Sequence, residues 1–134
     1  MLQMPKPDES VLSRRNDIVA ALRAIVPGEG VIVQHEEMRA YETDALTAYR
    51  QVPMVVVLPT TTEQISKILK YCNEAGVKVV PRGAGTSLSG GALPLADGIL
   101  LGGTFERGNW TLEPDQEAEK RVLEGHRRFF EAMR

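Results

Sequence analysis

The sequence predicts an α/β, or α+β, fold in which a strand, a helix and a second strand form a βαβ unit within a small mixed sheet. The first strand is expected at Met54–Leu58, because this run is continuously apolar, as in strands covered on both faces, and Pro59 ends it. The second strand is expected at Val77–Val80, which is apolar apart from Lys78 and should also be buried. A crossover through a helix makes such strands parallel and is right-handed by strong preference. A chain of 134 residues fits at most one small domain.

The helix between these strands has sequence signals at both ends. Thr60 and Glu63 fit a capping box, in which the hydroxyl and the carboxylate each accept a hydrogen bond from a backbone N–H of the first turn. Gly76 stands where a left-handed cap is expected. Between these two ends the helix has one apolar stripe at i, i+3, i+4 and i+7. Its members are Ile65, Ile68, Leu69 and Cys72. We interpret the cysteine as a packing residue, since buried thiols behave as small hydrophobes.

The residues on either side of this unit predict further elements. Asp8–Val26 has apolar residues at helical spacing and predicts one amphipathic helix, ended by the breaker cluster Pro27–Gly30. Val31–Val33 predicts a short strand, and His35–Gln51 predicts one short turn of helix followed by loop. Gly98–Leu101 predicts a third strand of the central region.

The chain therefore divides into three parts by composition. Residues 1–50 form an N-terminal helical and extended segment, and residues 51–102 form the central α/β lobe. Residues 103–134 form a tail that is richer in charge, with an amphipathic helix expected over residues 114–133. That helix needs an apolar surface to lie against.

Composition narrows the classes of partner. The net charge is −2, with 16 basic and 18 acidic side chains mixed along the chain, which disfavours nucleic acid and anionic membranes as partners. The single cysteine excludes an internal disulfide. The chain opens without a secretory signal and has no apolar run of about 18 residues, so no membrane span is expected. We expect a cytoplasmic protein.

The segment Pro81–Gly91, reading PRGAGTSLSGG, is the strongest candidate for a functional site. It holds four glycines and three hydroxyl side chains, and it follows a predicted parallel strand at the end where α/β sheets place ligands. Glycine has no Cβ, so successive N–H groups can converge on a diphosphate. A merely flexible connection does not need Arg82 and hydroxyl residues interleaved with its glycines.

Three familiar glycine motifs do not fit this segment. A P-loop needs lysine and a hydroxyl residue where Gly91 and Ala92 stand. The dinucleotide fingerprint fails because Gly83 and Gly85 are followed by Leu88 in place of the third glycine. No serine satisfies the Gly-x-Ser-x-Gly elbow of serine hydrolases.

The motif RGAGTSLSGG, with the sequence from Tyr41 to Leu101 around it, resembles the first half of the PCMH-type FAD-binding domain of FAD-linked oxidases of the vanillyl-alcohol oxidase type. Within that superfamily it is most similar to the D-subunit of glycolate oxidase and related D-lactate dehydrogenases. The resemblance implies FAD as cofactor, with Val57 and Pro59 near its adenine side. It places the following residues around the FAD pyrophosphate: Pro81, Arg82, Gly83, Ala84, Gly85, Thr86, Ser87, Gly90 and Gly91.

The resemblance also implies a parent activity, hydride transfer from a 2-hydroxy acid such as glycolate or D-lactate to the flavin. The tail does not resemble the second lobe and substrate domain that follow in the family, so we expect a truncated form that is incomplete for catalysis. No residue is assigned as a catalytic base. We interpret His35 and His126 as ordinary histidines and Trp110 as an anchor for the tail helix. Arg82 stays open between a phosphate contact and a structural partner of a carboxylate.

Two alternatives stay open beside this interpretation. The first is a non-catalytic interaction module whose tail helix docks on a partner. Its contact residues would be Leu123, Phe129, Phe130 and Met133. The second is one half of a split oxidase, completed by a chain that supplies the missing lobe or by other subunits of a glycolate-oxidase-like complex.

Overall fold

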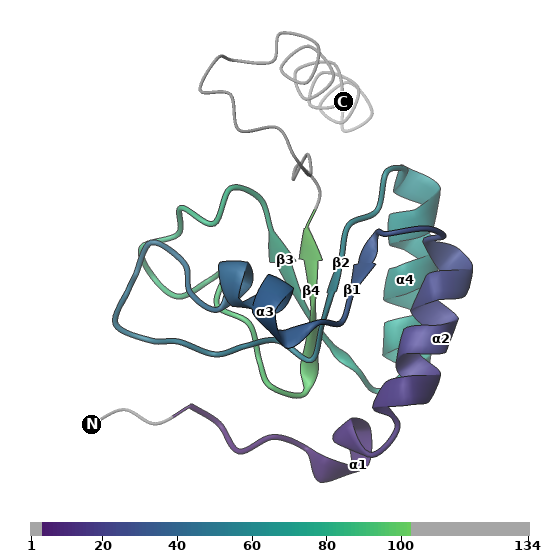
Figure 1. The fold of residues 1–134 in the computed structure, drawn as a ribbon, viewed down its shortest axis with the longest axis horizontal. Helices are drawn as coiled ribbons and strands as arrows, with labels where there is room; N and C mark the ends of the chain where they lie inside the picture. Colours follow the sequence, from purple (N-terminus) through teal and green to yellow (C-terminus); the bar gives the residue numbers. More distant parts are fainter. Residues whose placement is uncertain (1–3, 103–134) are drawn as a thin grey trace, which may run out of the picture.

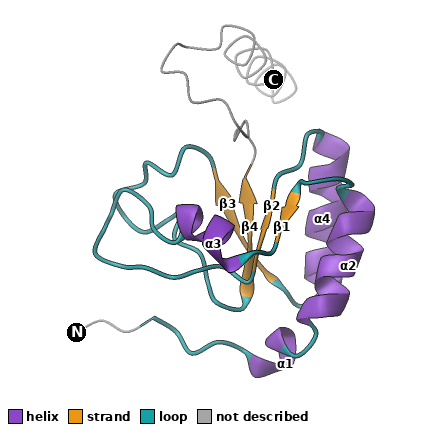
Figure 2. Ribbon diagram, in the orientation of Figure 1, coloured by secondary structure: helices purple, strands orange, loops and turns teal. Residues whose placement is uncertain are grey.

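Four strands form one mixed sheet with helices on both faces, in a computed structural model that describes residues 4–102 (Figure 1, Figure 2). The elements are α1 (Glu9–Leu12), α2 (Arg15–Ile25), β1 (Val31–Ile32), α3 (His35–Met38), the 3-10 helix η1 (Arg39–Tyr41), β2 (Val55–Val57), α4 (Thr62–Ala75), β3 (Lys78–Arg82) and β4 (Gly98–Gly102). The strands lie in the order β1-β2-β4-β3. β1 is antiparallel to β2, whereas β2, β4 and β3 run parallel. The mixed sheet and the parallel strands of the βαβ unit are thus confirmed, and β4 lies between those two strands.

The sheet is covered on both faces because successive side chains along a strand point to opposite sides. On one face, α2 and α4 pack against side chains that include Val55 and Ile99. On the other face, Met38 of α3 packs against Val56 and Leu100. Figure 1 shows α2 and α4 side by side on one side of the sheet and α3 on the other. This two-sided burial explains the continuous apolar runs of β2 and β4.

The amino end of α4 is capped one residue later than the sequence predicts. Thr61 is the N-cap, and its hydroxyl accepts a hydrogen bond from the N–H of Gln64 at 3.2 Å. The Oε1 atom of Gln64 in turn accepts from the N–H of Thr60 at 2.8 Å. The capping box predicted at Thr60 and Glu63 is therefore wrong, because Glu63 instead pairs with Lys67 on the exposed face of the helix.

The carboxyl end of α4 and its apolar stripe agree with the prediction. Gly76 is the C-cap with a φ of 67°, in the left-handed region. Ile68 and Cys72 are buried in the core. Ile65 and Leu69 are 37% and 46% exposed. They belong to the same stripe but line a groove between α4 and the ends of β3 and β4.

The single N-terminal helix predicted over Asp8–Val26 is two helices, α1 and α2. The chain leaves helical geometry at Arg14, which has φ −96° and ψ 10°. The break lets the Arg14 side chain donate to the carbonyl of Ala75 at 3.1 Å, at the last residue of α4. Arg15 likewise donates to the carbonyl of Met54, at 3.2 Å. These two contacts tie the start of α2 to the βαβ unit.

The remaining elements are close to their predicted positions. β1 occupies the first two residues of Val31–Val33, and His35–Gln51 begins with α3 and η1 before it becomes irregular. β3 extends through Pro81 and Arg82, which the sequence analysis had placed in the loop. β3 is an edge strand whose residues are exposed or half-buried, so the expectation of a buried strand is wrong, and a proline is tolerated there. The glycine-rich loop thus begins after the strand, at Gly83.

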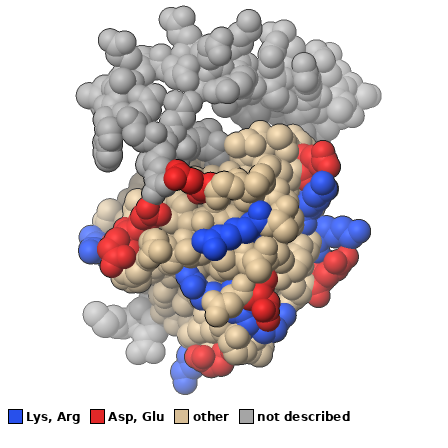
Figure 3. Space-filling model, turned by 45° about the vertical axis from the view of Figure 1, so that its right-hand side comes forward, with Lys and Arg blue, Asp and Glu red and all other residues tan. Residues whose placement is uncertain are grey.

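Charged side chains of both signs are interspersed on the face shown in Figure 3, with uncharged surface between them. This distribution agrees with the mixed charges of the sequence. Within residues 4–102, no helix is long and apolar enough to cross a membrane.

Candidate functional site

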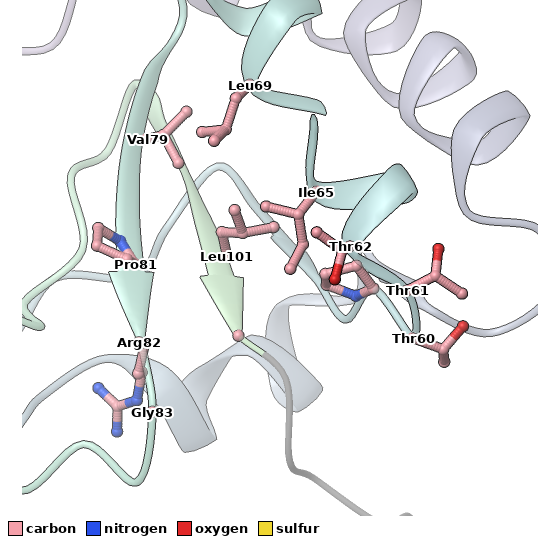
Figure 4. Close-up of a pocket in the computed structure, with 12 residues that line it drawn as sticks. Thr60, Thr61, Thr62, Ile65, Leu69, Val79, Pro81, Arg82, Gly83 and Leu101 are labelled. Carbon is pink, nitrogen blue, oxygen red and sulfur yellow. The ribbon is translucent and has the colours of Figure 1, made fainter. Parts of the chain in front are cut away.

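A groove of about 710 Å³ opens at the carboxyl ends of β3 and β4 and beside the amino end of α4 (Figure 4). Its walls are mainly apolar. Figure 4 shows Ile65 and Leu69 of α4 directed towards Leu101 and Val79 of the sheet. The lining residues are Pro59, Thr60, Thr61, Thr62, Ile65, Leu69, Val79, Pro81, Arg82, Gly83, Leu101 and Gly102. The groove therefore meets the glycine-rich loop at its first residue.

The loop that follows β3 turns towards the α3 side of the sheet, where its carbonyl groups are hydrogen-bonded. The N–H of Ala45 donates to the carbonyl of Gly85 at 2.9 Å, and the N–H of Leu46 donates to that of Ser87 at 3.1 Å. The carbonyl of Gly90 accepts from the N–H of Leu93 at 3.1 Å. The first two contacts fix the loop to the segment 43–46.

The N–H groups of the same loop are left available. Within the part of the chain that the structure describes, the backbone N–H groups of residues 84–88 have no hydrogen-bond acceptor. Most of these residues are exposed, so solvent or a ligand can reach them. The loop thus uses its carbonyls in internal hydrogen bonds and leaves consecutive amides without an acceptor, as in loops that bind phosphate oxygens.

Hydroxyl groups support the loop from within. The Oγ atom of Ser87 accepts from the N–H of Gly91 at 3.1 Å and from that of Ser89 at 3.4 Å. Both donors lie on the returning half of the loop, so this serine closes it. Gly90, with a φ of 75°, makes the turn between them, a conformation that side chains other than glycine rarely adopt.

Arg82, the last residue of β3, binds backbone carbonyls. Its Nη1 atom donates to the carbonyl of Thr43 at 2.8 Å and to that of Ala92 at 3.3 Å. In Figure 4 its side chain extends away from the apolar walls of the groove. The sequence left two roles open for this arginine, contact with a phosphate and pairing with a carboxylate. Among the described residues Arg82 pairs with no carboxylate; it binds two backbone carbonyls instead.

Asp44 is a member of the site that the sequence analysis missed. It is 4% exposed, and its Oδ1 atom accepts from the N–H of Leu46 at 3.0 Å. This bond closes an Asx-turn, the local structure that aspartate favours when it bonds to the backbone two residues further on. The signal in the sequence was Asp44 within a polar stretch that has no helical period. The turn presents the N–H groups of residues 45 and 46 to the loop.

The other candidate residues have ordinary environments. His35 is exposed at the start of α3. Burial raises the pKa of the Cys72 thiol to about 11, as expected for a packing residue. Val57 is fully buried in the core, so of the pair expected near the adenine only Pro59 reaches the groove. Within residues 4–102 no cluster of His, Cys, Asp or Glu could hold a metal ion.

The expectations for the tail fall on residues outside the described part of the chain. They concern Trp110, Leu123, His126, Phe129, Phe130, Met133 and the helix 114–133. They stay predictions.

Comparison with known families identifies the segment that carries the groove and the loop. Residues 53–118 match the family described as the FAD binding domain. Residues 53–118 belong to the FAD binding domain family. FAD is therefore the cofactor of this domain, as the resemblance implied. The matched range begins just before β2 and extends past residue 102, where the sequence analysis ended the family-like lobe.

Curated relatives of this FAD binding domain are subunits and enzymes that are far longer. The chain is 52% identical over 87 residues to the glycolate oxidase subunit GlcD of Escherichia coli (strain K12), an overlap that covers 65% of this chain and 17% of that protein. It is 43% identical over 77 residues to GlcD of Bacillus subtilis (strain 168), covering 58% and 16%. It is 39% identical over 85 residues to the mitochondrial D-2-hydroxyglutarate dehydrogenase of Bos taurus, covering 63% and 15%. The matched segment thus spans about one sixth of these relatives.

Solved structures confirm the fold of the domain. A p-cresol methylhydroxylase with substrate bound matches with a TM-score of 0.57 at 22% identity, over 75% of this chain and 20% of that one. The 4-ethylphenol oxidase from Gulosibacter chungangensis matches with a TM-score of 0.58 at 20% identity, over 86% and 22%. At these identities the likeness concerns the fold alone. It confirms the α/β fold expected for a PCMH-type FAD-binding domain.

Proposed function

We propose that this chain supplies the pyrophosphate-binding part of an FAD-dependent oxidoreductase that acts on a 2-hydroxy acid such as glycolate or D-lactate. The observation that carries the proposal is the run of backbone amides at residues 84–88, which have no acceptor among the described residues and lie beyond the carboxyl end of β3. The pyrophosphate carries negative charge, and backbone N–H groups of a glycine-rich loop bind such oxygens without a metal.

The groove beside the loop suits the adenine end of the cofactor. A flat aromatic base fits between the apolar side chains of α4 and those of β3 and β4, next to Pro59. Gly83 joins the groove to the loop. FAD would then extend from the groove onto the amides. The amino end of α4 borders the same space, and its helix dipole favours a nearby phosphate.

The proposed class of substrate is based on the names of the relatives. Glycolate and D-2-hydroxyglutarate, which their names include, are both 2-hydroxy acids. When bound, FAD accepts a hydride from the carbon that bears the hydroxyl group. The residues of this chain contribute binding and orientation of the cofactor, because the groove and the loop suit its adenine and pyrophosphate parts, and the matched segment spans only about one sixth of the relatives. We therefore propose that catalysis requires groups from outside residues 4–102, in further sequence or in a partner chain.

Titration of the purified chain with FAD tests this proposal directly. We expect saturable binding, a rise in the melting temperature with FAD concentration, and competition by ADP. Riboflavin is the matched control ligand, because it has the flavin ring but no pyrophosphate, and it should bind far more weakly. Equal binding of riboflavin and FAD would contradict recognition through the pyrophosphate, and no binding of FAD would contradict the proposal as a whole.

Gly83→Ala tests the close approach of the cofactor to the loop. A Cβ at Gly83 would have no neighbour within 4 Å, so the melting temperature without ligand should not change. If a phosphate approaches this backbone, the new methyl group should weaken FAD binding by about tenfold or more, as for the loss of a hydrogen bond to a charged group. Lys70→Ala, on the exposed face of α4, is the matched control and should bind FAD like the parent chain. Unchanged affinity in Gly83→Ala would place the phosphates elsewhere.

A further inference from the structure

The guanidinium group of Arg82 lies at the point where the two segments that hold the glycine-rich loop meet. Its Nη1 atom donates to the carbonyl of Thr43 on one side and to that of Ala92, after the loop, on the other. The loop thus leaves β3 at Arg82 and returns past the same side chain. One arginine therefore joins the base of the loop to the segment 43–46.

The rest of the guanidinium group is packed against Gly85. A Cβ built on this glycine would lie 2.6 Å from Cζ of Arg82 and 2.9 Å from its Nε, closer than any real side chain allows. The φ of Gly85 is 73°, so the residue also has a backbone conformation that favours glycine. The Arg82 guanidinium carbon is 5.8 Å from the ring centre of Tyr41. The loop therefore needs glycine at position 85 both for its turn and to admit the arginine.

This packing explains why the loop amides stay available. With Thr43 held by Arg82, the N–H groups of Ala45 and Leu46 meet the carbonyls of Gly85 and Ser87. Those bonds occupy carbonyl oxygens of the loop and do not involve its N–H groups. An arginine that grips a phosphate with two N–H groups needs one edge of its guanidinium exposed. Here Nη1 is bonded to two carbonyls, so only the edge formed by Nε and Nη2, which lies beside Gly85, has no acceptor among the described residues.

We propose that Arg82 is a positioning residue for FAD: it holds the glycine-rich loop in the conformation that presents its amides, and it contributes to FAD binding through these bonds to backbone carbonyls. The inference rests on the proposed function for its ligand, but the contact it describes exists without ligand. Lysine cannot replace arginine in this role, because a single ammonium group lacks the planar array of donors that reaches two carbonyls while it lies flat against a glycine.

Amide hydrogen exchange, measured by NMR on the full chain without FAD, tests the contact itself. In Arg82→Lys, the N–H group of Ala45 should exchange about tenfold faster or more, since it loses its fixed acceptor, whereas that of Leu46 should respond less because it also donates to Oδ1 of Asp44. The N–H groups of Val56 and Leu100, in the central strands, are internal controls and should not change. Unchanged exchange at residues 45 and 46 would overturn the proposal, whether or not the chain binds FAD.

FAD affinity then separates positioning from direct binding of phosphate. For a positioning arginine, Arg82→Lys and Arg82→Ala should both weaken FAD binding by about tenfold or more, because the lost contacts are charge-assisted hydrogen bonds. Millimolar ethylguanidinium should partly restore binding to Arg82→Ala, whereas ethylammonium should not. Retention of full affinity in Arg82→Lys, with loss only in Arg82→Ala, would show that the positive charge acts on the phosphate and would overturn the proposal.

Gly85→Ala provides a second variant that keeps the arginine. Its methyl group must displace the guanidinium group, so it should accelerate exchange at residues 45 and 46 and weaken FAD binding while the positive charge remains. In the Arg82→Ala background the same substitution should cause a smaller further change, because the clash is gone. Strictly additive effects of the two substitutions would contradict the packing of Arg82 on Gly85. If the parent chain fails to bind FAD while exchange responds as expected, the proposed function fails and the positioning contact stands.

Discussion

Replacement of Asp97 tests how the turn before β4 is anchored. Asp97 is 3% exposed, and its Oδ2 atom accepts from the Nζ of Lys78 at 2.7 Å and from the N–H of Asp8 at 3.1 Å. The carboxylate thus joins the N-terminal segment, the start of β3 and the turn that leads into β4. Asp97→Ala removes all of these bonds. Asp97→Asn keeps an acceptor oxygen and removes the charge.

The expected loss of stability follows from these contacts. A hydrogen bond to a charged group contributes about 1.5–3 kcal/mol when both partners are buried. The side chain of Lys78 is 52% exposed, and such a pair contributes at most about 1 kcal/mol because solvent screens it. We therefore expect Asp97→Ala to lower the free energy of unfolding by about 2 kcal/mol, and Asp97→Asn by about half of that. Urea denaturation at neutral pH measures both, with Lys78→Met as the control that removes only the ion pair.

The pH dependence of this loss has a definite sign. Burial raises the pKa of Asp97, but the hydrogen bonds from Lys78 and from the N–H of Asp8 outweigh it, so that the pKa lies below its usual value of 3.8. A carboxyl group whose pKa is lower in the folded state stabilises the fold above the pKa of the unfolded state, and this contribution is lost as the pH falls through the folded pKa. The stability difference between the parent chain and Asp97→Asn should stay constant at neutral pH and shrink below about pH 4. A difference that grows on acidification would refute this reasoning.

Two further predictions concern α4. Thr61→Ala should lower the free energy of unfolding by about 1 kcal/mol, as for loss of an N-cap, whereas Thr60→Ala should lower it by clearly less; chemical denaturation of both variants checks the register of the cap, and the reverse order would contradict it. The thiol of Cys72, buried and with its pKa raised to about 11, should resist iodoacetamide at pH 8 in the folded chain and react once urea unfolds it, which mass spectrometry can follow; rapid alkylation of the folded chain would show that the thiol is accessible.

The sequence predicts the central elements well because each has a local cause. The apolar run before Pro59 is long enough to mark a strand covered on both faces, and Gly76 has the one backbone conformation that ends α4. The four glycines of Pro81–Gly91 indicate a loop. Each of these signals comes from residues that are close together in the sequence, so it can be recognised without knowledge of the tertiary structure.

The features that the sequence did not predict depend on contacts between distant segments. Nothing near Arg14 indicates that its side chain reaches the end of α4, and this contact accompanies the break between α1 and α2. The exposure of Leu69 follows from the position of the groove, which helical periodicity cannot reveal. The role of Asp44 depends on the loop that docks against its turn. Arg82 binds carbonyls from both sides of that loop, so composition alone left its role open.

The path of the chain between β3 and β4 gives an independent reason to place function at this loop. β3 and β4 are adjacent and parallel, so the chain must run from the carboxyl end of one to the amino end of the other. A helix usually makes such a crossover, but residues 83–97 make it with neither helix nor strand. Irregular connections of this length are uncommon in compact domains unless they are functional. A helix here would bond its own amides internally, whereas the irregular chain, tied down through its carbonyls, keeps consecutive N–H groups available for an anionic ligand.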